Sequence, residues 1–191
     1  METSARDRVL GLLFLAAFPL YGVGSALLVT ESAGLGLTLV LANSLVVLGI
    51  GRILHSIALP YARVVAHLYL AARILEALLL GVSGGLVYQT GTADSGALYY
   101  RIAMIILGIA SLPLLGLLMG VGRMPAWLGW FGIVGYSVFI FGMVADGFGA
   151  VGLGLLLVIP GALFEVTFAV WLIVRGFARG SQEAPAPLTQ T

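Results

Sequence analysis

The sequence predicts an all-α membrane protein, a bundle of six transmembrane helices with its N- and C-termini in the cytoplasm. Hydrophobic residues make up 61% of the 191 residues and charged residues only 9%, and the mean hydropathy is +1.13. Soluble domains carry about 25% charged residues, so this composition excludes the soluble class. The apolar residues gather in runs of about 20 residues, the length that crosses a bilayer core as a helix.

Six such runs follow one another along the chain. We expect the spans at residues 9–29, 35–54, 61–86, 99–119, 127–145 and 153–174. The first run could be a signal peptide, but it is long enough to span and further spans follow, so we interpret it as a retained helix. Residues 1–8 then form a short N-terminal segment and residues 9–177 the transmembrane domain. Residues 178–191 have little apolar surface and are expected to be a disordered tail.

The connections contain the residues expected near a membrane surface or in a turn. Pro60 separates the second span from the third, because proline interrupts a helix. Tyr88–Ala97 is the most polar internal stretch and reads as an exposed loop that contains Asp94. Trp127 and Trp130 mark the start of the fifth span, since tryptophan favours the membrane interface.

The arginines decide the predicted orientation. All nine basic residues are Arg, and a six-span topology places most of them on the side of the termini. These are Arg6, Arg8, Arg52, Arg63, Arg123, Arg175 and Arg179. Arg101 alone falls on the other side, and Arg73 falls inside a span. Because basic loops stay inside the cell, we expect cytoplasmic termini and a multi-pass protein of the cytoplasmic (inner) membrane.

Four polar residues lie deep within the predicted spans: Asn43, Arg73, Glu76 and Glu165. A charge at the bilayer centre is costly, so such residues usually face the protein interior and pair with one another. Arg73 and Glu76 are three residues apart and therefore share a helix face. Glu165 has no cation in its own span, so we expect Arg73 to bridge both carboxylates and link the third span to the sixth. Sliding the first three spans over the last three lays Glu76 over Glu165, a correspondence without supporting residue identity.

Three interpretations of this polar set remain open. The first is a pocket or pathway that binds or transports a small amphiphile or a proton, since intramembrane ionisable residues commonly mark such sites. The second is a polar clamp that fixes helix packing in a structural or accessory subunit. The third is an intramembrane enzyme that acts on lipids. No nucleophile elbow, phosphate-binding loop or dinucleotide motif is present, so we predict no catalytic residue and no cofactor.

His55 and His67 are secondary candidates for the same site. They lack the close spacing of a helical metal motif, and the chain has no third His and no Cys, so no metal site is predicted. The expected partner is the lipid bilayer, with an unidentified small-molecule or lipid ligand and no nucleic acid.

Glycine is frequent, at 27 residues, and much of it lies within the spans. Gly81 and Gly85, and likewise Gly116 and Gly120, have the spacing that lets helix backbones approach closely. Gly129, Gly132 and Gly135 form a similar stripe in the fifth span. These glycines predict helix packing within one bundle, with a homo-oligomer interface as the alternative.

Several segments together resemble a known bacterial membrane family. They are Arg73–Leu78 (RILEAL), Gly122–Gly129 (GRMPAWLG), Pro160–Glu165 (PGALFE) and Trp171–Phe177 (WLIVRGF). In order and spacing they resemble the domain of unknown function 4386, from the first span to Phe177. The resemblance implies an integral membrane protein of about six helices. It places Arg73, Glu76 and Glu165 in the family pattern and implies no activity.

Overall fold

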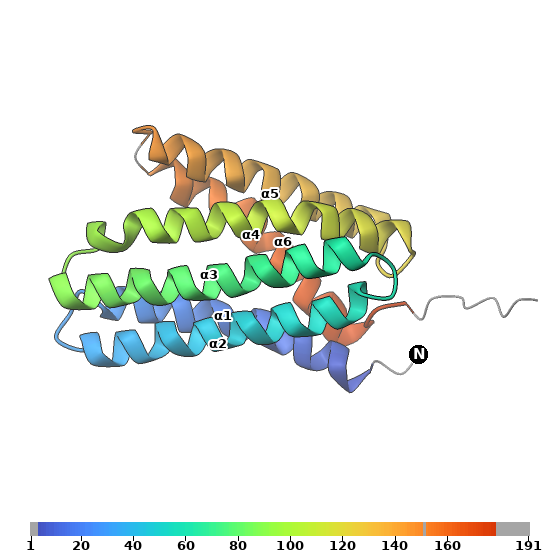
Figure 1. The fold of residues 1–191 in the computed structure, drawn as a ribbon, viewed down its shortest axis with the longest axis horizontal. Helices are drawn as coiled ribbons and strands as arrows, with labels where there is room; N and C mark the ends of the chain where they lie inside the picture. The colour runs from blue at the N-terminus through green and yellow to red at the C-terminus, as the bar shows by residue number, and fades with distance from the viewer. Residues whose placement is uncertain (1–3, 151, 179–191) are drawn as a thin grey trace, which may run out of the picture.

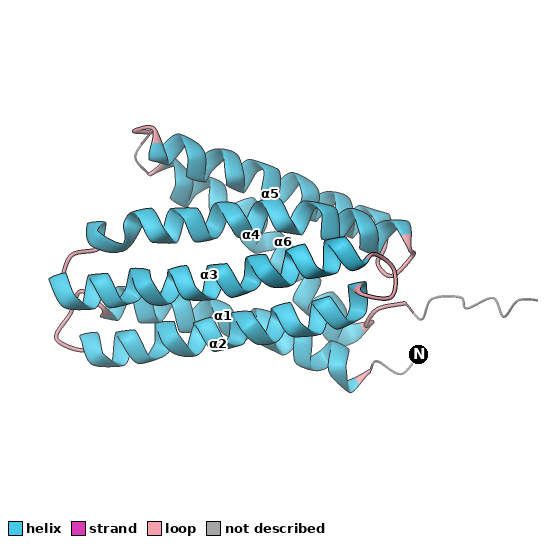
Figure 2. Ribbon diagram, in the orientation of Figure 1, coloured by secondary structure: helices cyan, strands magenta, loops and turns pink. Residues whose placement is uncertain are grey.

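The computed structural model describes residues 4–150 and 152–178, which form six α-helices and no strand (Figures 1 and 2). The helices are α1 (Ala5–Leu27), α2 (Ala33–Ala58), α3 (Arg63–Thr90), α4 (Asp94–Gly120), α5 (Ala126–Gly147) and α6 (Leu153–Val174). All six are long and apolar enough to cross a membrane. The all-helical, six-span prediction is therefore confirmed.

The helices form a closed ring. Each helix packs against its neighbours in the sequence, and α6 returns to pack against α1. Because successive helices run in opposite directions, α1 begins and α6 ends at the same end of the ring, which we call the terminal end (Figure 1). Figure 1 also shows that α1 and α6 meet near this end and move apart towards the opposite end.

Most helices are longer than the predicted spans because they continue into the polar residues at their ends. Ser4 precedes α1 and its hydroxyl accepts a hydrogen bond from the backbone N–H of Arg6, at 3.3 Å. The stretch 88–97, expected to be a loop, is mostly helical. α3 continues to Thr90, Gly91 ends it with a left-handed φ of 70°, and Asp94 lies in the first turn of α4. An acid there is favourable because it faces the positive end of the helix dipole.

The ring is held together at glycines, but mostly not at those with the predicted spacing. A Cβ atom added to Gly11 would lie 2.6 Å from the backbone oxygen of Ala169, so α1 and α6 touch there. Gly24 and Gly36 bring α1 and α2 together in the same way. By contrast, a Cβ at Gly85, Gly116 or Gly120 would meet no atom within 4 Å. The spacing of small residues predicted close approach at Gly85, Gly116 and Gly120, and the structure places them in open space.

The glycine stripe of the fifth span does serve packing inside the bundle, as predicted. A Cβ at Gly132 would lie 2.7 Å from the ring of Phe164, and one at Gly135 would lie 3.0 Å from the backbone oxygen of Pro160. These two glycines let α5 and α6 lie close together. α6 runs without a break through Pro160.

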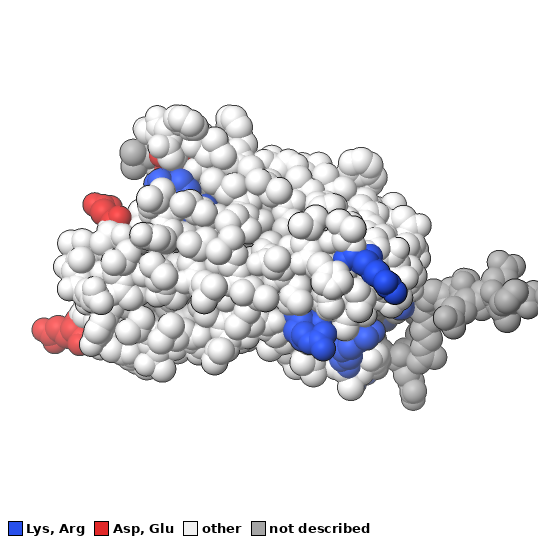
Figure 3. Space-filling model, in the orientation of Figure 1, with Lys and Arg blue, Asp and Glu red and all other residues white. Residues whose placement is uncertain are grey.

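The charged residues separate to the two ends of the ring (Figure 3). The arginines of the helix starts and turns gather at the terminal end. The acids Glu31, Asp94 and Asp146 lie at the opposite end of the ring. Arg101, at the acidic end, pairs with Asp146, with Nη2 3.1 Å from Oδ2. Arg179 and the predicted tail beyond residue 178 lie outside the described residues. The described arginines are therefore divided between the two ends of the ring as the sequence predicts.

The segment after α6 closes the terminal end. The backbone N–H of Phe177 donates to Oδ2 of the buried Asp7, at 3.2 Å. Arg123 donates from Nη1 to the backbone oxygen of Ala178, at 2.7 Å, and from Nε to the hydroxyl of Tyr61, at 3.0 Å. The ring of Phe177 packs against those of Phe168 and Trp171. These contacts join α1, the segment after α6, the α4–α5 turn and the α2–α3 connection, which contains Tyr61.

Candidate functional site

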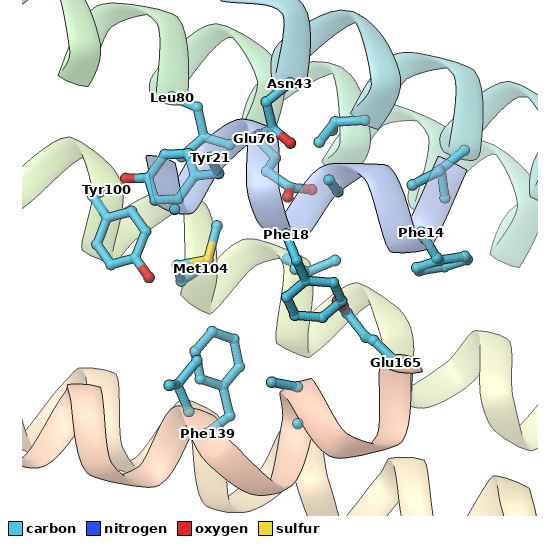
Figure 4. Close-up of a pocket in the computed structure, with 18 of the residues that line it drawn as sticks. Phe14, Phe18, Tyr21, Asn43, Glu76, Leu80, Tyr100, Met104, Phe139 and Glu165 are labelled. Atoms are coloured by element: carbon cyan, nitrogen blue, oxygen red, sulfur yellow. The ribbon is translucent and has the colours of Figure 1, made fainter. Parts of the chain in front are cut away.

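A cavity of about 410 Å³ lies inside the ring and receives side chains from all six helices (Figure 4). Most of its lining is apolar. The polar lining residues are Tyr21, Asn43, Arg73, Glu76, Tyr100, Tyr136 and Glu165. The four deep polar residues predicted from the sequence therefore line one common space.

Arg73 and Glu76 form the ion pair that their spacing predicts. Nη1 of Arg73 lies 2.9 Å from Oε2 of Glu76, and both side chains are 3% exposed. The guanidinium also lies over the ring of Tyr69, 5.9 Å from its centroid. Gly51 of α2 provides the room for the arginine stem, because a Cβ there would lie 2.6 Å from the Cβ of Arg73. The side chain of Arg73, which projects from α3, is thus held against α2.

Glu165 does not pair with Arg73, and the predicted bridge between α3 and α6 is wrong. Within the described residues, the ion pair of Arg73 is with Glu76 alone. Oε1 of Glu165 instead accepts a hydrogen bond from the hydroxyl of Tyr136, at 2.6 Å. The close approach of α5 and α6 at Gly135 places the Tyr136 hydroxyl nearer to Glu165 than the arginine of the opposite wall. The carboxyl of Glu165 therefore has a neutral donor where a cation was expected.

Asn43 contributes a buried acceptor without a donor. Its side chain is only 3% exposed, and Oδ1 has no hydrogen-bond partner in the described structure. Figure 4 shows this oxygen and the carboxylate of Glu76 on one side of the cavity and Glu165 on the other. Buried polar groups are normally satisfied, so an orphaned acceptor beside a cavity indicates a place for a ligand or water.

Two tyrosines close the cavity towards the opposite end. Tyr21 of α1 and Tyr100 of α4 stack with ring centroids 5.4 Å apart and an interplanar angle of 11°. Their helices lie on different sides of the ring, so the stacked pair crosses it. Below the cavity, towards the terminal end, the rings of Phe14, Phe164 and Phe168 pack against one another. Both ends of the cavity are therefore covered by aromatic side chains.

The side of the cavity is open between α1 and α6. Gly22 of α1 and Leu155 of α6 line the cavity and are also exposed on the outer surface, Leu155 by 76%. The lining residues of α2 and α3, such as Asn43 and Leu80, are buried. In a membrane this opening would face the lipid chains.

His55 and His67 lie outside the cavity lining. Their rings contact each other edge to face, with centroids 5.0 Å apart. Nδ1 of the exposed His67 hydrogen-bonds to the backbone oxygen of Arg63, at 2.7 Å, whereas the ring nitrogens of the buried His55 have no partner among the described residues. No group of three or more potential His, Cys, Asp or Glu ligands occurs in the part of the chain that the structure describes.

Sequence reasoning missed the tyrosines of the site. Tyr136 is 29 residues from Glu165 and reaches it only because α5 packs on α6. Tyr21 and Tyr100 come from helices that are distant in the sequence. A tyrosine inside a span was the available signal, since its hydroxyl needs a partner in an apolar environment.

Comparison with known protein families identifies a match over most of the chain. A family described as Domain of unknown function (DUF4386) matches residues 30–176. The matched region contains α2 to α6, so it is shorter than the resemblance expected from the first span onward. It includes Asn43, Arg73, Glu76 and Glu165. The comparisons with curated proteins and with solved structures find no match.

Proposed function

The chain belongs to the domain of unknown function 4386 family, and we propose that its helix ring binds a small amphiphile in the central cavity. The observation that carries the proposal is the combination of an apolar cavity of about 410 Å³ with a few converging polar groups. Small-molecule sites in proteins commonly enclose about 300–1,000 Å³ and have this mixed lining.

The opening between α1 and α6 supports a ligand that is dissolved in the membrane. Gly22 and Leu155 stand at this opening, on the surface that a bilayer would cover. A molecule with an apolar body could enter from the lipid phase and place its polar head among Asn43, Glu76 and Glu165. A strictly hydrophilic solute would have to cross hydrocarbon or displace the stacked Tyr21 and Tyr100.

The alternative of a purely structural clamp has weaker support. The Arg73–Glu76 ion pair lies within one helix and so cannot tie two helices together. Within the described residues, the one hydrogen bond between polar lining residues of different helices is that of Tyr136 with Glu165. A clamp also gives no reason for the space beside these groups, since interiors are normally close-packed.

Binding of labelled decanol to the purified protein in phosphatidylcholine nanodiscs tests the proposal. We expect saturable binding near one molecule per chain, above that of empty nanodiscs. The Ala162→Phe variant should lose this binding because residue 162 lines the cavity. The matched Ala26→Phe variant adds the same bulk to an exposed position of α1 and should retain it. Equal binding by both variants, or no saturable binding by the wild type, would overturn the proposal.

A further inference from the structure

We infer that the cavity selects a cationic amphiphile, an apolar chain with an ammonium head group that is held by the carboxyl group of Glu165 and the amide oxygen of Asn43. The inference rests on the proposed function and adds the chemical class of the ligand. Three observations carry it: the charge balance of the lining, the shortage of hydrogen-bond donors and the position of the only lining arginine.

The charged groups of the lining do not balance. Among the described residues, Arg73 is the one basic lining residue, and Glu76 and Glu165 are the acidic ones. Glu76 already neutralises Arg73 at 2.9 Å. Glu165 is left with the neutral hydroxyl of Tyr136 as its hydrogen-bond donor. A carboxylate beside an apolar lining favours a cationic partner, because apolar side chains do not stabilise its charge.

The hydrogen-bonding groups are unbalanced in the same direction. The amide oxygen of Asn43 has no donor, although its side chain is only 3% exposed. Among the other fully buried lining atoms that lack a hydrogen bond in the described structure, Oε2 of Glu76 is an acceptor and Nε of Arg73 is a donor. The hydroxyls of Tyr21 and Tyr100 can donate or accept and leave the balance unchanged. An ammonium group has three donors and no acceptor, which meets this surplus of acceptors.

The arginine is placed badly for holding an anion. Its side chain is 3% exposed, its stem packs on Gly51, and one side of its guanidinium is taken by Glu76. An anionic head group would therefore approach two carboxyl groups before it could reach a free arginine nitrogen. Phe18 also lines the cavity, and aromatic faces attract cations.

A comparison of three probes with the same chain tests the inference. Decylamine, decanol and decanoate are titrated into the protein in phosphatidylcholine nanodiscs, and each is measured as displacement of labelled decanol. We expect wild-type protein to bind decylamine about tenfold or more tightly than decanol, since a hydrogen bond to a charged group contributes about 1.5–3 kcal/mol. Decanoate should bind most weakly. Empty nanodiscs correct for partition of each probe into the lipid.

Variants assign the preference to Glu165. Glu165→Gln should reduce the ratio of decylamine to decanol affinity to near one, while decanol binding persists. Glu31→Gln makes the same chemical change at an exposed position of the α1–α2 connection, outside the cavity lining. This variant should keep the wild-type ratio of decylamine to decanol affinity.

The outcomes separate this inference from the proposed function. Equal binding of the three probes, or a preference for decanoate, would overturn the cationic class and leave amphiphile binding standing. An unchanged ratio in Glu165→Gln would remove Glu165 from the site. Failure of every probe to bind the wild type would overturn both proposals. The wild-type comparison needs no variant, so it decides the ligand class even if Glu165→Gln does not fold.

Discussion

At the scale of single residues, the site is a set of polar side chains whose partners differ in kind. Arg73 and Glu76 neutralise each other, Glu165 has a tyrosine hydroxyl, and Asn43 has an acceptor without a donor. A buried charge that loses its partner costs far more than a buried pair that is removed as a whole. The ion pair therefore has a testable energetic signature.

The first prediction concerns this ion pair. Arg73→Leu should lower the free energy of unfolding by about 3 kcal/mol because it strands the carboxylate of Glu76. The double variant Arg73→Leu with Glu76→Gln should recover much of the loss. Unfolding of purified protein by sodium dodecyl sulfate in mixed micelles measures both, and the non-additive part is the coupling energy.

Two comparisons control this cycle. Arg73→Leu and Glu165→Gln should add, since no ion pair joins these residues in the described structure. Arg101→Leu, at the partly exposed pair with Asp146, should cost about 1 kcal/mol or less. A strong coupling between Arg73 and Glu165 would contradict the pairing that the structure shows.

At the scale of helices, close approach at particular glycines decides which side chains enter the cavity. Gly51 lets α2 lie against the stem of Arg73, and Gly135 lets α5 lie against the backbone of α6 beside Pro160. Without the contact at Gly135, the Tyr136 hydroxyl would sit farther from Glu165. The glycines therefore position the site without touching a ligand.

The second prediction follows from Gly51. Gly51→Ala places a Cβ 2.6 Å from the Cβ of Arg73, so α2 and α3 must separate. Overpacking of this kind costs about 1–3 kcal/mol. We expect a lower free energy of unfolding and weaker decanol binding, measured as described above.

Gly85→Ala provides the matched control for this change. The Cβ at residue 85 meets nothing within 4 Å, so the substitution should be neutral or stabilising by up to about 1 kcal/mol, because alanine is the better helix former. Equal destabilisation by both alanines would show that the contact between α2 and Arg73 is unimportant.

At the scale of the whole molecule, the ring has one end rich in arginine and one rich in acids (Figure 3). α1 begins and α6 ends at the arginine-rich end, where residues 177 and 178 are tied to Asp7 and Arg123. An excess of Arg on the side that stays inside the cell orients membrane proteins. The orientation in the membrane is therefore predicted from the distribution of charge over the whole molecule and not from any single helix.

The third prediction is this orientation in a bacterial cytoplasmic membrane. A reporter enzyme whose activity depends on its compartment, fused after Phe177, should behave as cytoplasmic. The same reporter inserted between Thr92 and Ala93, in the short α3–α4 connection, should behave as external. The reverse result at both sites would contradict the orientation, and the same compartment at both sites would contradict the six-span topology.

The sequence by itself determined the class of the protein, the six spans, the separation of charge and the identity of the deep polar residues. The reason is that bilayer thickness sets the length of an apolar run, and the cost of a buried charge makes each deep polar residue conspicuous. These signals are local in the chain. For the same reason the Arg73–Glu76 pair, which lies within one turn of one helix, was predicted correctly.

Only the tertiary structure decided the partner of Glu165, the glycines at which helices touch, and the presence of a cavity with an opening between α1 and α6. Each depends on how helices distant in the sequence are rotated and spaced against one another. Whether Glu165 faces Arg73 or Tyr136 depends on how α6 is rotated about its axis, and a spacing of small residues is compatible with an inner or an outer face. Such rotations follow from the packing of all six helices together, because no single apolar stripe distinguishes lipid from protein neighbours in a membrane.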